Sequence, residues 1–543
     1  MNVRVGILCW LAGGLLSVGA YAGEKTDPLL PHLERQGTAT RLIVDGHPFL
    51  VRGAELNNSS ASSLDYMKPL WPKLAATHLN TVLATVSWEL IEPQEGKFEF
   101  GLVDGLIQEA RANNLHLVFL WFGSWKNGKS TYQPLWVKTN QERFPLARSK
   151  DGKSVPVLST LSGANRDADA RAFAALMRHL RETDGGKHTV LMIQVENEVG
   201  ILGDSRDHSS AADTAFAGPA PKELLDYLQA HKDTLIPQLR QRWETAGFKT
   251  SGTWEEVFGA GDATDEMFMA WNYARYIGRV AAAGKGEYAL PMYVNAWLRQ
   301  PDYPKPGDYP SGGPLPQVMD VWRAGARDID ILSPDIYATN FTEWCQWFAQ
   351  SGNPLFIPES RGDARGAANG IWAFGAQDAM GYSPFGIDRM AGADTELARA
   401  YDVIAQVSPM ILASQGRNLM TAVLLDRDQT QTVRLGNYNI EARFSARSFG
   451  PATNTSPDRV AGLFIAEGPD DFLVVGRSMN VYFTVATDPA QKVGLGTVEE
   501  GVYREGRWIP GRRLNGDETP EWRALRFRGD AYTIQRVKLY RYQ

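Results

Sequence analysis

The sequence predicts an α/β fold, a (β/α)8 barrel followed by a smaller, sandwich-like all-β domain. Two patterns support this prediction. Between residues 49 and 388, short β-rich runs alternate with helical stretches, and beyond about residue 411 the helical patterns give way to short alternating strands rich in turn residues. A chain of 543 residues is long enough for a large barrel and a second domain.

The first 22 residues differ from the rest of the chain. A short basic start, MNVR, precedes the apolar run VGILCWLAGGLLSVGA and the small-residue pattern AYA, which ends at Ala22. The apolar run is shorter than a bilayer span requires, and the three parts together are typical of a secretory signal peptide. We therefore expect residues 1–22 to be removed and the protein to be exported, either to the periplasm or into the medium.

Residues 23–412 are predicted to form the barrel, which begins with a hairpin. The hairpin joins TRLIV to HPFLV through Asp45 and Gly46, a dipeptide that favours a type I′ turn. Near-continuous apolar strands separated by helices indicate a parallel sheet covered on both faces, and eight of them indicate a closed barrel. The predicted strands are residues 49–56, 80–88, 115–123, 189–197, 290–297, 330–337, 353–360 and 381–388.

Two further segments complete the organisation. Residues 203–262 are rich in Asp, Ala and Gly and follow the fourth predicted strand, so we expect them at the rim of the barrel. Residues 413–543 contain alternating runs such as QTVRLGNYNIEARFS and DFLVVGRSMNVYFTVAT and are predicted to form the β domain.

Composition narrows the class of partner. With 43% hydrophobic and 22% charged residues, the chain is typical of a globular protein with a sizeable core. A formal charge of -6 and a pI near 5.9 leave no basic footprint for nucleic acid or an anionic membrane. No His or Cys spacing is typical of a metal site. We expect a neutral substrate, no cofactor, no nucleic-acid partner and no membrane span; no pattern indicates an oligomeric state.

Two glutamates at strand ends form the strongest functional signal. Glu198 closes the fourth predicted strand in LMIQVENEVG, and Glu359 closes the seventh in LFIPES. Carboxyl groups on the active face of a barrel supply what glycoside hydrolysis needs, an acid for the leaving oxygen and an ionised group for the oxocarbenium-like carbon. A gap of about 5 to 5.5 Å between them makes the second group a nucleophile, whereas about 6.5 to 9.5 Å admits a water molecule.

The motifs QVENEVG and PES, together with NTVLATVSWELIEPQEGKFEF at residues 80–100, resemble those of glycoside hydrolase family 35. This mostly β-galactosidase family belongs to the large clan A, whose TIM barrels carry the acid/base and the nucleophile on strands four and seven. The resemblance spans most of residues 40–400. The β-rich tail looks like the C-terminal module of bacterial members that act on plant cell-wall galactosides.

The resemblance implies roles for four residues. Glu198 matches the acid/base, Glu359 the nucleophile, and Asn197 the residue that binds the sugar 2-hydroxyl. Tyr337 ends the sixth predicted strand, where clan members often place a tyrosine that donates to the nucleophile and keeps it ionised. The family also implies a retaining mechanism.

Other residues at strand ends are further candidates for sugar binding. Trp88, Trp125 and Trp372 lie at or just beyond predicted strand ends, where an indole can stack on the apolar face of a sugar. Glu55 closes the first strand, where its carboxyl group can either bind a hydroxyl or pair with Arg52.

The segment after the third strand departs from the family pattern. Many members carry an acidic residue there that binds the sugar hydroxyl groups far from the anomeric carbon. The sequence WFGSWKNG instead offers Ser124, Lys126 and Asn127.

The local geometry of the fourth strand is also constrained. Strict alternation would put Glu196 and Glu198 on one face and Asn197 on the other. Asn197 and Glu198 can both reach the sugar only if regular strand geometry ends by about Glu196, with Gly200 helping the chain to turn away. We expect Glu196 to lie one layer deeper and to brace its neighbours by hydrogen bonds.

The sequence thus predicts a retaining, exo-acting β-galactosidase that removes terminal β-D-galactose from plant-derived oligosaccharides, with xyloglucan side chains among the candidate substrates. One alternative is another retaining glycosidase of the same clan, namely a β-glucosidase, a β-glucosaminidase or an endo-glucanase. The other is a non-catalytic carbohydrate-binding barrel, against which the paired Glu198 and Glu359 argue.

Overall fold

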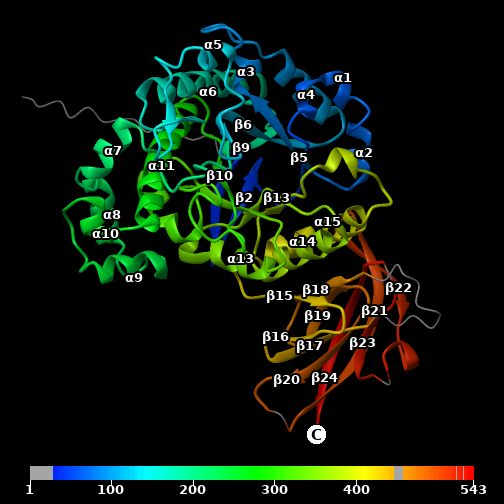
Figure 1. The fold of residues 1–543 in the computed structure, drawn as a ribbon. Coiled ribbons are helices and arrows are strands. Elements are labelled where there is room, and N and C mark those ends of the chain that lie inside the picture. Colours follow the sequence, from blue (N-terminus) through cyan, green and yellow to red (C-terminus); the bar gives the residue numbers. More distant parts are fainter. Residues whose placement is uncertain (1–28, 446–456, 489, 521, 530) are drawn as a thin grey trace, which may run out of the picture.

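The computed structural model describes residues 29–445, 457–488, 490–520, 522–529 and 531–543. The expected signal peptide lies outside these residues. A barrel of strands and helices forms the N-terminal part, and two β-sheets form the C-terminal part (Figure 1). The predicted architecture is therefore correct. Among the helices of the described residues, none is long and apolar enough to cross a membrane.

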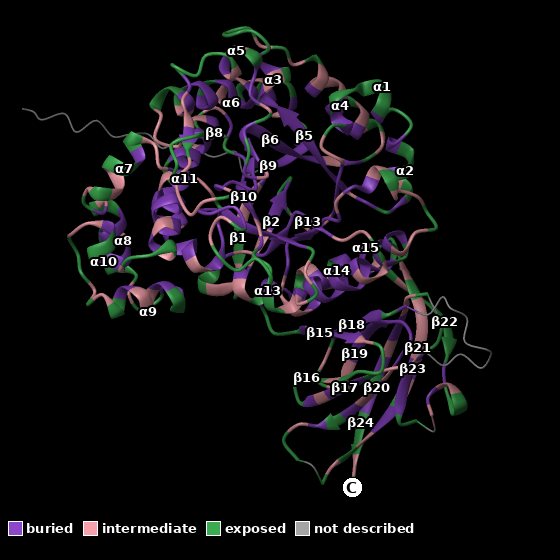
Figure 2. Cartoon of the chain, viewed as in Figure 1, coloured by how far each residue is buried: buried purple, intermediate pink, exposed green. Residues whose placement is uncertain are grey.

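The barrel is a parallel sheet whose order follows the sequence. Every residue of its central strands is buried, because helices cover the outer face and side chains fill the interior (Figure 2). The strands are β4 (Val51–Glu55), β5 (Thr81–Ser87), β6 (His116–Lys126), β9 (Val190–Asn197), β10 (Met292–Trp297), β11 (Ile331–Ile336), β12 (Phe356–Ile357), β13 (Glu359–Ser360) and β14 (Gly381–Tyr382).

The predicted seventh strand closes the barrel in two pieces. β12 pairs with β14, and β13 pairs with β11, so the two pieces bond to opposite neighbours. Pro358 separates them, since its nitrogen carries no hydrogen for a ladder bond. This interruption makes Glu359 the first residue of β13, at the edge of the barrel where the strands end.

The eighth predicted strand is much shorter than expected. Of residues 381–388, only Gly381 and Tyr382 form a strand, with one further bridge between Phe385 and Glu55. Pro384 cannot donate to a ladder, and Gly386 has a φ of 74°, which turns the chain out of the sheet. In contrast, β6 runs on to Lys126, three residues beyond the predicted end of the third strand.

The helices surround the barrel (Figure 1). Side-chain caps fix several of their starts: Ser162 accepts a hydrogen bond from the Asn165 N–H at the start of α6, and Thr395 accepts one from the Ala398 N–H at the start of α15. The helices are α1 (Leu64–Met67), α2 (Trp71–Ala76), α3 (Trp88–Ile91), α4 (Gly101–Ala112), α5 (Leu135–Lys138), α6 (Gly163–Asp184), α11 (Asp262–Lys285), α12 (Met319–Gly325), α13 (Phe341–Phe348), α14 (Ala364–Ala376) and α15 (Glu396–Ser414). A short ribbon of β7 (Leu146–Arg148) and β8 (Ser154–Leu158) lies between α5 and α6.

A three-stranded antiparallel sheet precedes the barrel. It consists of β1 (His32–Gln36), β2 (Ala39–Val44) and β3 (His47–Phe49), of which β1 was not expected from the sequence. Asp45 and Gly46 both have positive φ values, 51° and 76°, as the predicted type I′ turn requires. Leu42 and Val44 belong to the same buried cluster as apolar side chains of β4, β5 and β6. The hairpin therefore closes the end of the barrel at which the strands begin, opposite their carboxyl ends.

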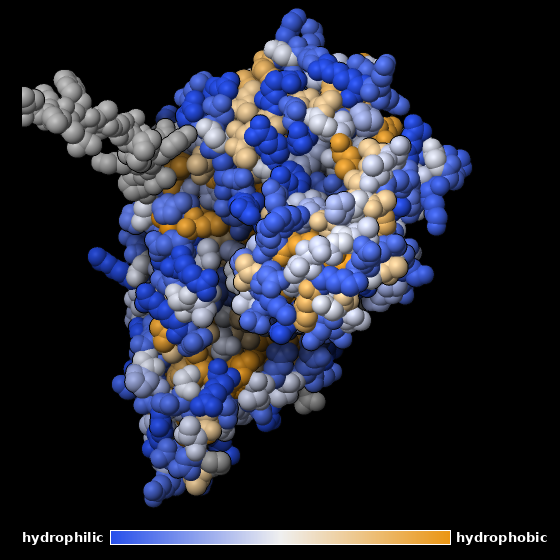
Figure 3. All heavy atoms as spheres, turned by 90° about the vertical axis from the view of Figure 1, so that its left-hand side faces the viewer, coloured by the Kyte–Doolittle hydropathy of each residue, from blue (hydrophilic) through white to orange (hydrophobic). Residues whose placement is uncertain are grey.

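The insertion after the fourth strand forms four helices at the left of Figure 1. They are α7 (Ser210–Ala217), α8 (Lys222–Ala230), α9 (Pro237–Thr245) and α10 (Trp254–Phe258). A capping box between Thr253 and Glu256 starts α10. The surface that carries these helices is mostly hydrophilic, with hydrophobic residues in scattered patches (Figure 3).

The C-terminal domain is a sandwich of two antiparallel sheets with an apolar core between them. The larger sheet has the order β15 (Met420–Asp426), β18 (Arg459–Ala466), β19 (Asp471–Gly476), β24 (Thr533–Tyr542), β21 (Lys492–Arg504) and β22 (Arg507–Arg513). The smaller sheet has the order β16 (Thr430–Leu435), β17 (Tyr438–Phe444), β20 (Met479–Val485) and β23 (Ala524–Phe527).

The larger sheet packs against α14 of the barrel. Gly375 permits this contact, since a Cβ at that position would overlap Leu463. Arg459 links the two parts: its guanidinium binds both oxygens of Asp426 at 2.8 and 2.9 Å and donates to Asn369 on α14 at 3.0 Å. The sandwich is thus fixed to the side of the barrel and does not contribute to its open face.

Candidate active site

The fourth strand ends in an irregular backbone that brings two adjacent side chains, Asn197 and Glu198, next to Glu359. Glu196 and Glu198 both have positive φ values, 64° and 43°, which non-glycine residues adopt only where the fold holds them there. These conformations break the alternation of the strand, as expected from the need for Asn197 and Glu198 to reach the same place. Gly200, with a φ of 143°, turns the chain away, and a Cβ there would overlap Pro310.

Glu359 lies opposite, at the start of β13. Its Oε2 accepts a hydrogen bond of 2.8 Å from the Tyr337 hydroxyl, and its Oε1 lies 3.5 Å from the Asn197 amide nitrogen. Both side chains thus direct a hydrogen-bond donor at the Glu359 carboxyl group. The structure therefore brings together the four residues for which the motifs implied roles, namely Asn197, Glu198, Tyr337 and Glu359.

The carboxyl groups lie close together. Glu198, Asp335 and Glu359 each place one carboxylate oxygen within 4.8 Å of those of the other two. At this separation the groups can act on the same glycosidic bond from within one cavity.

The environment of Glu198 favours its protonated form. Burial and, next, the negative charge of Glu359 raise the pKa of Glu198 to about 8, although Lys126 and a hydrogen bond from Asp335 oppose the shift. The backbone N–H of Glu198 donates to the Asn295 side chain at 3.0 Å. At neutral pH, Glu198 is therefore an acid whose position is fixed beside Glu359.

Asp335 belongs to the candidate active site, although it was not identified from the sequence. It lies on β11 two residues before Tyr337, and its Oδ2 accepts a 2.7 Å hydrogen bond from Asn295. Burial and the charges of Glu359 and Glu198 raise its pKa well above the usual range of an aspartic acid. One of its carboxyl oxygens lies within 4.8 Å of one of Glu198. An acidic residue within the apolar run ILSPDIY was the available signal.

Lys126 provides the positive charge of the site. Its Nζ donates to the Asn197 Oδ1 at 2.9 Å, which orients the amide nitrogen of Asn197 towards Glu359. Burial disfavours the charged form of Lys126, but the carboxyl groups of Glu359 and Glu198 outweigh burial and raise its pKa. The departure from the family pattern after the third strand thus puts a cation among the carboxyl groups.

Glu55 lies at the end of β4 with its side chain fully buried. Burial and the nearby charge of Glu359 raise its pKa well above the usual range. It does not pair with Arg52, whose guanidinium donates instead to the His78 carbonyl and the Ser408 hydroxyl. Of the two roles left open for Glu55, the ion pair with Arg52 is wrong, and sugar binding stays a prediction.

A cavity of about 870 Å³ opens above these groups. This volume lies within the roughly 300–1,000 Å³ typical of small-molecule sites. Besides Lys126, Glu198, Asp335, Tyr337 and Glu359, its walls include Asn58, Asn127, Trp297, Arg299 and Phe385.

The three tryptophans expected to stack on a sugar do not line this cavity. Trp88 donates to Glu92, Trp125 donates to the Leu158 carbonyl, and Trp372 packs against the edge of Phe341. All three are buried in the hydrophobic core between strands and helices. The expectation was wrong because a large aromatic side chain near a strand end can point outward, into the barrel–helix interface.

Trp297 is the indole that does border the cavity. It is the last residue of β10 and is only partly buried. The same rule that selected the other tryptophans, an aromatic residue at a strand end, applies to the run LPMYVNAW and would have selected it.

Glu196 and Ser124 lie behind the cavity wall. The carboxylate of Glu196 accepts the backbone N–H groups of Ser124 and Trp125 at 3.0 and 2.7 Å, and the Ser124 hydroxyl donates to Asp169 at 2.6 Å. Burial, and then the charge of Asp169 and a hydrogen bond to it, raise the pKa of Glu196 well above its usual range. Glu196 therefore braces the end of β6, the segment that carries Lys126.

Comparison with known proteins identifies two regions of similarity. Residues 70–275 match the family 42 glycoside hydrolase model, described as beta-galactosidase, and residues 397–526 match a domain of unknown function, DUF5597. The first match belongs to the same clan of barrels as the family that the motifs resemble, but it is a match to family 42 and not specifically to family 35.

One curated relative is a beta-galactosidase of Xanthomonas manihotis. It is 30% identical over 207 residues, which are 36% of this chain and 31% of the relative, so the chain spans about a third of its length. Solved structures to which the chain is similar include a beta-galactosidase from Rahnella sp. R3, with 14% identity, a TM-score of 0.45 and coverage of 68% of this chain and 57% of that one. Another is from Bacillus circulans sp. alkalophilus, with 11% identity, a TM-score of 0.48 and coverage of 90% and 99%.

Proposed function

We propose that the protein is a retaining, exo-acting β-galactosidase that hydrolyses terminal non-reducing β-D-galactose. The observation that carries the proposal is the pair formed by Glu198 and Glu359, two carboxyl groups with oxygens within 4.8 Å of each other and opposite environments. Glu198 is held protonated at neutral pH, while Tyr337 and Asn197 donate to Glu359. The galactoside assignment is supported by the beta-galactosidase model that matches residues 70–275.

The proposed reaction is a double displacement. A carboxylate oxygen of Glu359 attacks the anomeric carbon while the proton of Glu198 moves to the departing glycosidic oxygen, giving a covalent glycosyl-enzyme and the free alcohol. Glu198, now ionised, takes a proton from water, whose oxygen attacks the anomeric carbon and releases Glu359. The two inversions give galactose with the configuration of the substrate.

The surrounding residues support the different roles of Glu359 as nucleophile and Glu198 as acid/base. The Tyr337 hydroxyl and the Asn197 amide stabilise the charge on Glu359 before attack. The interaction with Asp335 opposes the rise in the pKa of Glu198 and so favours the ionised form that Glu198 takes after the first step. Lys126 offsets part of the negative charge that three neighbouring carboxyl groups bring to one cavity.

The finer assignments are part of the proposal. Plant-derived oligosaccharides, with xyloglucan side chains among them, are supported by the likeness of the C-terminal β domain to modules of bacterial plant-cell-wall enzymes. Membership of family 35 is supported by the motifs around Asn197, Glu198 and Glu359. Export is supported by the pattern of residues 1–22.

Azide rescue tests the assignment of the two glutamates. In Glu359→Gly, azide should attack the free anomeric face and give an α-galactosyl azide. In Glu198→Ala, the glycosyl-enzyme still forms from an activated aryl galactoside, and azide should give a β-galactosyl azide. Glu99→Ala, which removes an exposed carboxylate, is the control and should not respond to azide. The opposite pairing of anomers would reverse the two roles.

Relative rates on aryl β-glycosides test the sugar. We expect kcat/KM to be highest for the β-galactoside in a series that includes the β-glucoside and the β-glucosaminide. A clear preference for the glucoside would refute the galactosidase assignment and leave the retaining mechanism intact. Binding of sugar by the pure protein without turnover of any member of the series would refute an enzymatic function.

A further inference from the structure

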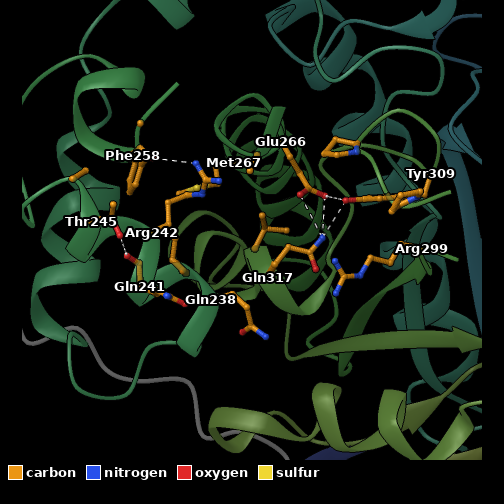
Figure 4. A pocket seen from close by; sticks show the side chains of 17 residues that line it. Gln238, Gln241, Arg242, Thr245, Phe258, Glu266, Met267, Arg299, Tyr309 and Gln317 are labelled. Atoms are coloured by element: carbon orange, nitrogen blue, oxygen red, sulfur yellow. Dashed lines mark hydrogen bonds between the residues drawn. The ribbon is translucent and has the colours of Figure 1, made fainter. Parts of the chain in front are cut away.

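A second cavity lies beside the candidate active site. Its volume is about 620 Å³, and its walls come from α9, α10, the first turns of α11 and the long loop that follows β10 (Figure 4). Arg299, two residues beyond the end of β10, lines both this cavity and the one that contains Glu198 and Glu359. Arg299 therefore borders both spaces, and the second cavity lies next to the first.

The second cavity has two arginines but only one acidic side chain. Arg299 and Arg242 approach the space from opposite sides (Figure 4). Arg242 donates to the Phe258 carbonyl at 3.2 Å and to the Thr264 hydroxyl at 3.5 Å. Within the described part of the chain, neither arginine forms an ion pair with a carboxylate, although many other arginines of this acidic protein do.

Glu266 lies between the two arginines and offsets their charge only in part. Its buried carboxyl group accepts hydrogen bonds from the Tyr309 hydroxyl at 3.0 Å and the Gln317 amide at 3.2 Å. Burial raises its pKa to about 7, although these hydrogen bonds and the two arginines oppose the shift. Two guanidinium groups and one carboxyl group leave the cavity with a net positive charge even when Glu266 is ionised.

The other lining groups suit a carbohydrate. Gln238 and Gln241 on α9 project amide groups, which can donate to and accept from sugar hydroxyls (Figure 4). The Thr245 hydroxyl donates to the Gln241 carbonyl at 2.8 Å and can still accept from a sugar hydroxyl. Apolar side chains, among them Leu239, Phe258 and Met267, complete the walls.

We propose that this cavity is a subsite for an acidic sugar unit, a uronic acid, in the part of the substrate that follows the terminal galactose. The proposal rests on the proposed galactosidase function and adds the chemical class of the aglycone. The carboxylate of the uronic acid would bind the guanidinium groups of Arg242 and Arg299, which match a carboxylate in charge and geometry. The overall charge of the chain favours neutral partners, but the charge of this cavity is locally positive.

Matched oligosaccharides test the proposal. Galactose is released from compounds in which the first or second sugar after the galactose is glucuronic acid, and from the same compounds with glucose in its place. For at least one position, we expect kcat/KM to be about tenfold or more higher for the acidic compound, because a charge-assisted hydrogen bond to the carboxylate replaces a neutral contact. In Arg242→Gln and in Arg299→Gln, this ratio should fall towards one.

Arg240→Gln is the matched control. Arg240 is on the same helix as Arg242 but lines neither cavity, and its guanidinium lies 3.9 Å from the Asp233 carboxylate. This variant should retain both the acidic preference and the rate on aryl galactosides. Calorimetric binding of the acidic compound to inactive Glu359→Gln gives a second readout, and its affinity should fall with increasing salt.

The outcomes separate the two proposals. Equal rates on acidic and neutral compounds, or an acidic preference that survives both arginine substitutions, would overturn the subsite and leave the galactosidase function standing. Failure to release galactose from any compound, aryl galactosides included, would refute the galactosidase function. Salt-independent binding of the acidic compound would also count against the subsite.

Discussion

Neutralising Glu359 should lower the pKa of Glu198. In Glu359→Gln, the shape of the side chain is retained and its charge is lost. The two carboxyl groups place oxygens within 4.8 Å of each other, and at that distance two unit charges repel by about 3.5 kcal/mol if the effective dielectric constant is near 20. This energy corresponds to about 2.5 pKa units.

Burial, the largest cause of the raised pKa of Glu198, stays in place when the charge of Glu359 is removed. We therefore expect the pKa to fall from about 8 by about 1.5 to 2.5 units. The same fall would occur when Glu359 becomes glycosylated, since the ester is uncharged. It would convert Glu198 from the acid of the first step into the base of the second step.

Carbon-13 NMR of protein labelled at the glutamate carboxyl carbon measures this pKa, with Glu198→Gln to assign the signal. Glu99→Gln, which removes an exposed charge, should leave the titration of Glu198 in place. A pKa of Glu198 that changes by less than about half a unit in Glu359→Gln, or that rises, would refute the electrostatic coupling between the two groups.

Further predictions concern activity and stability. The kcat/KM of the wild type should fall as the pH rises through about 8, because Glu198 then loses the proton that the first step requires; a flat profile between pH 7 and 10 would contradict this role. Tyr337→Phe removes the 2.8 Å hydrogen bond to Glu359 and should lower kcat/KM on aryl galactosides about 10- to 100-fold with the fold intact by circular dichroism, so an unchanged rate would exclude the tyrosine from catalysis. Trp297→Ala should raise KM more than it lowers kcat, and an unchanged KM would argue against contact with the sugar. Gly123→Ala should destabilise the protein by about 2 kcal/mol in thermal or urea unfolding, because its Cβ would lie 2.6 Å from Glu196 and 2.8 Å from Asp169; wild-type stability would show that this region yields easily.

The barrel strands could be predicted because each one corresponds to a recognisable local pattern in the sequence. Parallel barrel strands are buried on both faces, so each reads as a short apolar run, and all of the predicted runs contain a strand. The eighth was overestimated because Pro384 and Gly386 interrupt a run that is otherwise apolar enough. Glu198 and Glu359 could be identified from the sequence for a related reason, since a polar residue that ends a buried barrel strand lies on the open face of the barrel.

The rest of the candidate site depends on contacts between distant segments. Lys126 and Asp335 acquire a role only through their neighbours Asn197 and Glu198, which lie on other strands. No local pattern distinguishes such a lysine from one in solvent. The rotation of a side chain about its strand is equally non-local, which explains why Trp125 lies in the core whereas Trp297 faces the cavity.

Of the second cavity, the sequence predicted only that residues 203–262 lie at the rim of the barrel. Their helices do form part of a wall there. The convergence of Arg242 from this insertion with Arg299 from a different loop is set by tertiary packing, which spacing in the sequence does not reveal.

Mass spectrometry of the protein after reaction with 2-deoxy-2-fluoro-β-galactosyl fluoride tests the central claim most directly. The fluorine slows both steps, and the good leaving group lets the first step proceed, so the glycosyl-enzyme should accumulate. We predict one added fluorogalactosyl group, located by peptide sequencing on Glu359. A label on another residue, or galactose release from substrates with no label under these conditions, would contradict the proposed mechanism.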